Sequence, residues 1–304
     1  MRSAVRRMAV STMTELPLVV GVDGSDPSLT AVDWATDEAA RLGLPLRLVH
    51  ASLWERYEGA MTLRGQERPS AQVLAEHIVA SAAERARRRN PDVGVSTAVL
   101  TTEPADALLD EGDNATLLVT GSRGRGELKG LLLGSVGLAV AARAHCPVTV
   151  VRGDAAALAG THERILLGAG DPDTGGDAVR LAFREAEARA CTLDVVRAWR
   201  CPAHESGDPP APADERARRH EERASALLDD VLREAAAEHP AVRVRRTTVE
   251  GPAAKVLVDR SAAADLVIVG ARRRVGHLGL QLGRVSHTLL HHAHCPVTVV
   301  PQRV

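Results

Sequence analysis

A glycine-rich stretch in the first half of the chain has the residue types and spacing of a phosphate-binding loop. Gly121 is followed after two residues by Gly124, and after nine more by Gly134 and Ser135. Glycines let backbone N–H groups approach an anion, because no Cβ stands in the way. The apolar segment that begins at Gly134 predicts a helix, whose N-terminus offers unpaired N–H donors and a partial positive charge. The pattern therefore predicts a site for the phosphates of a nucleotide.

A carboxylate at the end of the first predicted strand gives this site a second component. Asp23 follows the apolar run LPLVVGV at residues 16–22. A helix cap is the simpler role for Asp23, but Asp26 lies immediately before Pro27 and fits that role better. A carboxylate at the tip of this strand can accept hydrogen bonds from a ribose or a base. Arg123 adds positive charge near the phosphates, although arginines on surface loops are often only solvated.

An internal repeat supplies the elements that position these residues. The octapeptide AHCPVTVV occurs at residues 144–151 and again at 293–300, and weaker similarities recur at offsets of 147 to 149 residues. Each copy alternates five short apolar segments with helical patterns, which predicts a parallel sheet with helices on both faces. We therefore expect an α/β protein with two tandem doubly wound domains, each with a five-stranded parallel sheet, at residues 16–151 and 164–304.

The order of the elements brings the two candidate loops together. In the first copy, strands are expected at residues 16–22, 44–52, 93–101, 115–121 and 147–151, and helices at 26–42, 69–90, 134–144 and after Pro104. In open α/β sheets, ligands bind outside the carboxyl ends of the strands, where the strand order reverses. The loop with Asp23 leaves the first strand and the glycine-rich loop leaves the fourth, so we expect both at one crevice.

Composition excludes several classes of function. Aromatic residues make up 2% of the chain and the formal net charge is −1, which argues against a nucleic-acid partner, since base-stacking platforms and a basic surface are both lacking. The four cysteines form no C-x-x-C pair and are expected to be reduced, buried thiols. No apolar segment approaches the roughly 18 residues of a membrane span, and no signal-peptide pattern is present. We expect a cytoplasmic protein that does not bind membranes.

These motifs together resemble those of the universal stress protein family in its tandem two-domain form. The resemblance is carried by VGVDGSDPS at residues 20–28, by the G-x2-G-x9-G-S pattern, and by the closing HCPVTVV strand. It implies a fold similar to that of the adenine nucleotide alpha hydrolases, with strand order 3-2-1-4-5 in each domain. It also implies dimers paired through the last strand and an adenine nucleotide as ligand. Some members of the family hold ATP, some hold other adenine nucleotides, and others bind none.

The resemblance also implies which residues contact the ligand. Gly21 and Asp23 would contact it from the first strand, and Ala51 would lie near the base. The ribose and phosphates would lie over Thr120, Gly121, Arg123 and Gly124, and the phosphate end over Gly134, Ser135 and Val136. Gly137 stands where the family often has a hydroxyl residue, which removes one phosphate contact.

The second copy has lost part of this pattern. Asp23, Gly124 and Ser135 correspond there to Gly170, Arg273 and Arg284. A lost charge-assisted hydrogen bond costs about 1.5–3 kcal/mol, so we expect roughly hundredfold weaker ATP binding in the second domain. The repeated CPVTVV strand, in contrast, predicts that the exposed edges of the two sheets pair within one chain as a pseudo-dimer, or between chains as a homodimer.

We expect a regulatory protein, not an enzyme, that binds one ATP with Mg²⁺ in the first domain and acts on an unidentified protein partner. Neither a G-x-S-x-G elbow nor a G-x4-G-K-[ST] loop is present. Two alternatives remain: an ATP-consuming phosphotransferase, adenylating protein or hydrolase on a related fold, and an interaction module with an empty pocket. His287 and His291 could share a metal, but a zinc site needs a third ligand, so we expect no metal site.

Overall fold

The computed structural model describes residues 16–53, 70–124, 133–170, 172–201, 212–271, 274–276 and 279–302. The first half comprises β1 (Leu18–Gly21), α1 (Asp26–Leu42), β2 (Leu46–Ala51), α3 (Ser70–Arg89), β3 (Val95–Leu100), α4 (Pro104–Gly112), β4 (Leu117–Gly121), α5 (Ser135–Arg143) and β5 (Val148–Val151). A short helix, α6 (Ala155–Leu158), links it to the second half.

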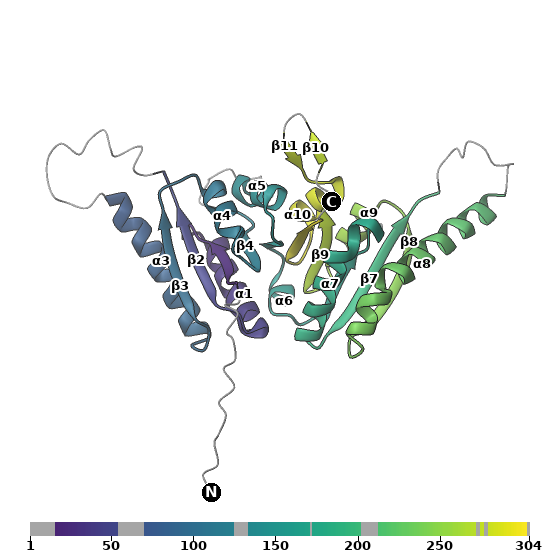
Figure 1. The fold of residues 1–304 in the computed structure, drawn as a ribbon, viewed down its shortest axis with the longest axis horizontal. Coiled ribbons are helices and arrows are strands. Elements are labelled where there is room, and N and C mark those ends of the chain that lie inside the picture. The colour runs from purple at the N-terminus through teal and green to yellow at the C-terminus, as the bar shows by residue number, and fades with distance from the viewer. Residues whose placement is uncertain are drawn as a thin grey trace, which may run out of the picture.

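The second half repeats this order of elements. It comprises β6 (Arg164–Gly168), α7 (Pro172–Ala188), β7 (Thr192–Trp199), α8 (Ala213–Glu238), β8 (Arg243–Glu250), α9 (Ala253–Ser261), β9 (Leu266–Ala271), β10 (Arg274–Gly276), β11 (Gly279–Gln281), α10 (Arg284–His292) and β12 (Val297–Pro301). The strands β10 and β11 form a separate antiparallel hairpin. Figure 1 shows the two halves side by side, with α3 and α8 toward opposite ends of the molecule.

The main strands form one ten-stranded sheet in the order β3-β2-β1-β4-β5-β12-β9-β6-β7-β8. All pairings within a half are parallel, and the halves are joined by the antiparallel pair β5–β12. At the centre of this pair Thr149 lies opposite Thr298, and their hydroxyl oxygens are 2.7 Å apart. This topology confirms the 3-2-1-4-5 order in each half and the pairing of the repeated last strands inside one chain.

The helices cover both faces of the sheet because the strands are apolar on both faces. In β1, Leu18 and Val20 point into a core shared with α1, α3, α7 and α8, whereas Val19 points into a core shared with α4, α5, α9 and α10. All three valine and leucine side chains are fully buried. The doubly wound arrangement expected from the alternation of strands and helices is confirmed.

The predicted cap of the first helix is wrong by one residue. The N-cap is Ser25, whose side chain accepts a hydrogen bond from the N–H of Ser28, and Asp26 is the first helical residue. Ser25 and Asp26 both have side chains that can cap a helix. Ser25 is the cap because Asp23 holds it in place through two hydrogen bonds. At the other end Gly43 is the C-cap, in the left-handed conformation with φ of +68°.

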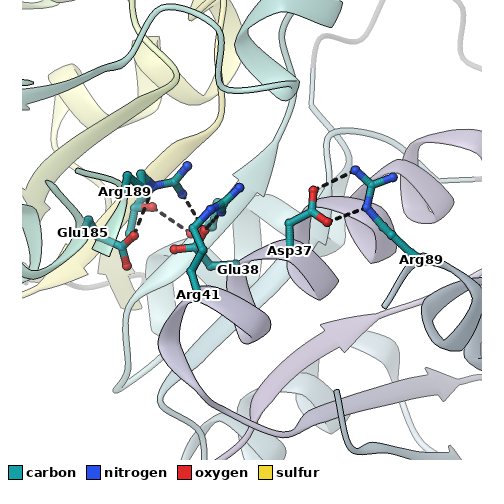
Figure 2. A network of polar contacts seen from close by, with 8 residues as sticks. Asp37, Glu38, Arg41, Arg89, Glu185 and Arg189 are labelled. Atoms are coloured by element: carbon teal, nitrogen blue, oxygen red, sulfur yellow. Dashed lines mark hydrogen bonds and ion pairs between the residues drawn. The ribbon is translucent and has the colours of Figure 1, made fainter. Parts of the chain in front are cut away.

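Buried charges join the halves where α1 meets α7 (Figure 2). Glu38 on α1 and Glu185 on α7 occupy equivalent positions of the repeat, and their side chains are 1% and 4% exposed. Arg189 lies between them, with nitrogens 2.6 Å from Glu38 and 3.4 Å from Glu185. Arg41 also pairs with Glu38, and the Arg189 guanidinium lies 5.8 Å from the centre of the Trp34 ring.

The two carboxyl groups have pKa values shifted in opposite directions. Burial and the neighbouring charge of Glu38 raise the pKa of Glu185 well above its ordinary value. Burial also opposes ionisation of Glu38, but Arg189, a hydrogen bond with Glu185, and Arg41 together lower its pKa. Glu185 therefore keeps its proton to higher pH than an ordinary glutamate, because two adjacent buried negative charges would repel each other.

In each half an ion pair joins a strand to a helix. The strand carries the positive charge in the first half and the negative charge in the second. In the first half Arg47 on β2 pairs with Glu111 on α4, at 2.6 and 2.7 Å. At the equivalent positions of the second half, Asp194 on β7 pairs with Arg260 on α9, at 3.5 Å. The same strand-to-helix contact is thus made with the charges exchanged.

In the first half, ion pairs also join the two long helices. Asp33 pairs with Arg85, and Asp37 with Arg89 (Figure 2), through parallel hydrogen bonds between α1 and α3. The corresponding positions in the second half carry Arg180, Arg184, Glu234 and Glu238, with the signs reversed. If α3 packed against α7, the arginines of α3 would face Arg180 and Arg184. The charges therefore favour the packing of each long helix within its own half.

Candidate functional site

A cavity of about 440 Å³ lies at the carboxyl ends of β1 and β4. It is lined from β1, β2, β4, α4 and the N-terminus of α5, by Gly21, Val22, Asp23, Ser28, Val49, Ala51, Pro104, Leu108, Thr120, Gly121, Arg123, Gly124, Leu133, Gly134, Ser135, Val136 and Gly137. This is the point in the first half where the strand order reverses. The loops after the first and fourth strands meet there, as expected from their order in the sequence.

The structure brings all the residues predicted for the ligand site to this one cavity. They are Gly21, Asp23, Ala51, Thr120, Gly121, Arg123, Gly124, Gly134, Ser135 and Val136. Their contact with a ligand stays a prediction, because the lining defines a place and not an occupant.

Two of the glycines lie where a side chain would meet other atoms. A Cβ on Gly121 would lie 2.6 Å from the carbonyl oxygen of Pro27, so β4 can end against the start of α1 only with glycine there. A Cβ on Gly124 would lie 2.6 Å from Oδ2 of Asp23. The glycine-rich loop and the carboxylate from β1 therefore touch, and Gly124 leaves room for Asp23 on the cavity wall.

The N-terminus of α5 forms the polar end of the cavity. Gly134 is the N-cap and has no side-chain cap, and its N–H donates to the carbonyl oxygen of Ser122 at 2.9 Å. The first bond inside the helix runs from the N–H of Leu138 to the carbonyl oxygen of Gly134. The N–H groups of Ser135 and Val136 precede it and have no acceptor within the helix. With the partial positive charge of the helix end, they suit an anion.

Asp23 has a structural contact in addition to its place on the cavity wall. Its Oδ1 accepts hydrogen bonds from the N–H of Ser25 at 3.0 Å and from the Ser25 hydroxyl at 2.6 Å. Its Oδ2 is the atom nearest to the Cβ position of Gly124. One oxygen thus holds the turn that starts α1, while the other faces the glycine-rich loop.

An apolar wall of the cavity was not predicted from the sequence. Val49, Pro104, Leu108 and Leu133 line it beside the predicted residues. The signal was weak but present, because Val49 lies two residues before Ala51 on a strand and therefore shares its face. Leu108 follows Pro104 by four residues on α4, which places both on one side of that helix. Such a wall suits the apolar faces of an aromatic ring.

The equivalent region of the second half has different chemistry. Gly170 supplies no carboxylate, and its carbonyl oxygen instead accepts a hydrogen bond from Arg197. Arg284 is the first residue of α10 and is exposed. Arg273 lies outside the described residues.

Other candidate groups show no reactive arrangement in the described part of the chain. The four cysteines are free, and burial raises the pKa of Cys146 to about 11 and that of Cys295 further, so both thiols are protonated at neutral pH. The rings of His287 and His291 lie 4.5 Å apart, but no group of three or more potential metal-ligating side chains occurs among the described residues. None of the described helices combines the length and apolarity needed to cross a bilayer.

The two halves and the cavity define a tandem α/β protein with a ligand site at the switch point of its first sheet. Both halves match the model of the Universal stress protein family, at residues 17–152 and 161–301. The chain belongs to the universal stress protein family, in the two-domain form that the sequence motifs indicated.

Relatives of similar length support the assignment. A universal stress protein of Mycobacterium tuberculosis is 34% identical over 292 residues, which are 94% of this chain and 97% of the relative. One from Mycolicibacterium smegmatis is 32% identical over 302 residues, covering 97% of this chain and all of the relative.

A solved structure that spans nearly the whole chain shares the fold. The crystal structure of a universal stress protein from Archaeoglobus fulgidus covers 94% of this chain and 98% of its own, with a TM-score of 0.64 at 17% identity. A universal stress protein in complex with cAMP is 32% identical and covers 45% of this chain and 97% of its own, with a TM-score of 0.35.

Proposed function

We propose that this protein binds one adenine nucleotide, namely ATP, in the cavity of its first half and that it acts as a regulator. The observation that carries the proposal is a single cavity with an uncapped helix N-terminus, a glycine-lined loop and an apolar wall. A nucleotide has the matching parts, an anionic chain of phosphates joined to an aromatic base. A cytoplasmic location stays a prediction from the sequence.

The phosphates would lie against the N-terminus of α5. Backbone N–H groups of Ser135 and Val136, together with the Ser135 hydroxyl, are donors suited to phosphate oxygens. Arg123 lines the same end of the cavity and adds a positive charge. The donors need no movement of the main chain, since the helix already holds them in place.

The nucleoside would lie toward β1 and β2. Val49, Ala51 and Leu108 offer the apolar surface for a base. Asp23 stands between this wall and the glycine-rich loop, where a carboxylate can accept hydrogen bonds from ribose hydroxyl groups. The carboxylate is held in place by Ser25, so its orientation is set before a ligand arrives.

Magnesium would enter with ATP. Mg²⁺ in nucleotide sites keeps many of its ligands among phosphate oxygens and water. The described residues provide no group of three or more metal-ligating side chains, so the ion would be held mainly through the nucleotide.

We propose that the second half binds ATP much more weakly. It lacks a carboxylate at the Asp23 position, and Arg284 replaces the serine at the start of the helix. A regulatory role, as opposed to catalysis, is supported by the cavity's lining, in which Asp23 and Arg123 are the ionisable side chains among the described residues.

Calorimetry on the full chain tests the proposal. ATP, ADP, AMP, adenosine and GTP are titrated with and without Mg²⁺ into the wild type and into Gly124→Ala, whose new Cβ displaces the Asp23 carboxylate. We expect preference for adenine nucleotides and about tenfold weaker binding in Gly124→Ala. Gly283→Ala in the second half is the control, because its new Cβ would meet no atom within 4 Å. Release of phosphate over many turnovers would favour the enzyme alternative, and absence of all binding would favour an interaction module.

A further inference from the structure

A buried hydroxyl at the end of β4 has no structural partner. Thr120 is 5% exposed, and its Oγ1 makes no hydrogen bond with any described residue. An unpaired buried hydroxyl destabilises a fold, so native proteins rarely keep one without another use for it. A valine of the same shape would avoid that cost. We therefore expect the hydrogen-bond partner of the Thr120 hydroxyl to come from a bound ligand.

The position of Thr120 points to the phosphate end of the cavity. The residue lines the cavity and packs against the first turn of α5. A Cβ on Gly137 would lie 3.3 Å from the Thr120 hydroxyl oxygen, so position 137 and Thr120 face the same small space. This space adjoins the helix N–H groups that would hold phosphate.

The second half contains the same pair of positions with the hydroxyl exchanged. Thr120 corresponds to Val269 at the end of β9, and Gly137 to Ser286 in the first turn of α10. Both Val269 and Ser286 are buried, each 3% exposed. Each half thus carries one hydroxyl at this place, on the strand in the first half and on the helix in the second.

We propose that the Thr120 hydroxyl donates to a phosphate oxygen of the bound nucleotide and replaces the hydroxyl that Gly137 lacks. The inference rests on the proposed nucleotide site and names a specific donor for its phosphate end. Thr120 Oγ1 can donate because no acceptor in the described structure uses its hydrogen. The hydroxyl of Thr120 on β4 thereby replaces the phosphate contact that is lost with glycine at position 137.

Four full-length variants test this assignment: Thr120→Val, Thr120→Ser, Gly137→Ser and the double variant Thr120→Val/Gly137→Ser. Calorimetry gives the dissociation constants of ATP and of adenosine, which has no phosphate. We expect Thr120→Val to weaken ATP binding about tenfold or more and to leave adenosine unchanged, because the lost hydrogen bond is made to a charged group. Thr120→Ser should retain ATP affinity. The double variant, which copies the Val269–Ser286 arrangement, should recover most of it.

Thermal unfolding without nucleotide gives a second readout. Thr120→Val should melt at the same temperature as the wild type or higher, because it removes an unpaired hydroxyl. Equal loss of ATP and adenosine affinity in Thr120→Val, unchanged ATP affinity, or a lower melting temperature without ligand would each overturn the assignment. If the wild type itself binds no adenine nucleotide, the proposed function fails first and this inference with it.

Discussion

Glu38 and Glu185 stand at equivalent positions of the two halves and share the guanidinium of Arg189 across the buried contact between α1 and α7 (Figure 2). Because the two carboxyl groups lie close together under almost complete burial, only one of them is readily ionised. The stability of the contact between α1 and α7 therefore depends on the protonation of Glu185.

This arrangement predicts that stability falls as pH rises. The raised pKa of Glu185 means that the folded protein keeps a proton that the unfolded chain releases above about pH 4.3. Its contribution is fully present below that pH and is lost as pH rises through the folded-state pKa. The lowered pKa of Glu38 acts in the opposite sense, and its contribution is lost only as pH falls below the ordinary glutamate range.

Urea unfolding of the wild type and Glu185→Gln between pH 5 and 8 measures the effect. Glutamine stays neutral, so the wild type should lose free energy of unfolding relative to the variant, by at most about 1.4 kcal/mol per pH unit. Glu84→Gln, on the exposed face of α3, is the control and should follow the wild type. Parallel pH profiles of the wild type and Glu185→Gln would contradict the shared proton.

The reversed ion pairs predict that exchanging the charges of both partners restores most of the stability that is lost when one partner changes. Arg47→Asp places two carboxylates together on β2 and α4 and should lower the free energy of unfolding by about 1–2 kcal/mol. Arg47→Asp combined with Glu111→Arg copies the Asp194–Arg260 pair and should recover most of the loss. Urea unfolding of the two single variants and the double variant gives the coupling energy. The exposed pair Arg143–Asp106 is the control and should show a smaller coupling. Additive effects of Arg47→Asp and Glu111→Arg on the free energy of unfolding would contradict the prediction, because the two side chains would then contribute independently.

A strained residue at the end of α7 predicts a stabilising substitution. Ala190 has a φ of +50°, in the left-handed region that disfavours residues with a Cβ, whereas its counterpart Gly43 has a φ of +68°. Ala190→Gly should raise the free energy of unfolding by about 0.5–1 kcal/mol, and Gly43→Ala should lower it by a similar amount. Melting temperatures of the two variants provide the measurement. A lower melting temperature for Ala190→Gly would mean that the strain at α7 is smaller than the entropy that glycine costs.

Much of the fold and of the candidate site could be predicted because the information is local or repeated. The parallel sheet with helices on both faces follows from the alternation of apolar and amphipathic segments, and the β5–β12 pair follows from the octapeptide at 144–151 and 293–300. The strand order within each half came from the resemblance to the family. The spacing of Gly121, Gly124 and Gly134 and the position of Asp23 after a strand indicated the site from the residues themselves. The resemblance to the family added Gly21, Ala51, Thr120 and Val136.

The remaining features depend on contacts between distant segments. Ser25 and Asp26 are both good caps, and the contact of Ser25 with Asp23 decides between them. Glu38 and Glu185 lie on amphipathic helices where a glutamate is usually solvated, and they are buried only because the halves meet there. The hairpin of β10 and β11 follows no periodic pattern that distinguishes it from a loop. The unpaired state of the Thr120 hydroxyl is a property of its surroundings and not of its residue type.

The stoichiometry of ATP binding tests the central claim most directly. Equilibrium dialysis of the full chain with Mg²⁺ and ATP, compared with Gly124→Arg, counts the nucleotides bound and identifies the half that holds them. Gly124→Arg installs in the first half the residue that the second half carries at that position. The account predicts one ATP per wild-type chain with high affinity and a loss of affinity of about a hundredfold in Gly124→Arg. Two equivalent ATP molecules per chain, no ATP, or undiminished binding by Gly124→Arg would contradict it.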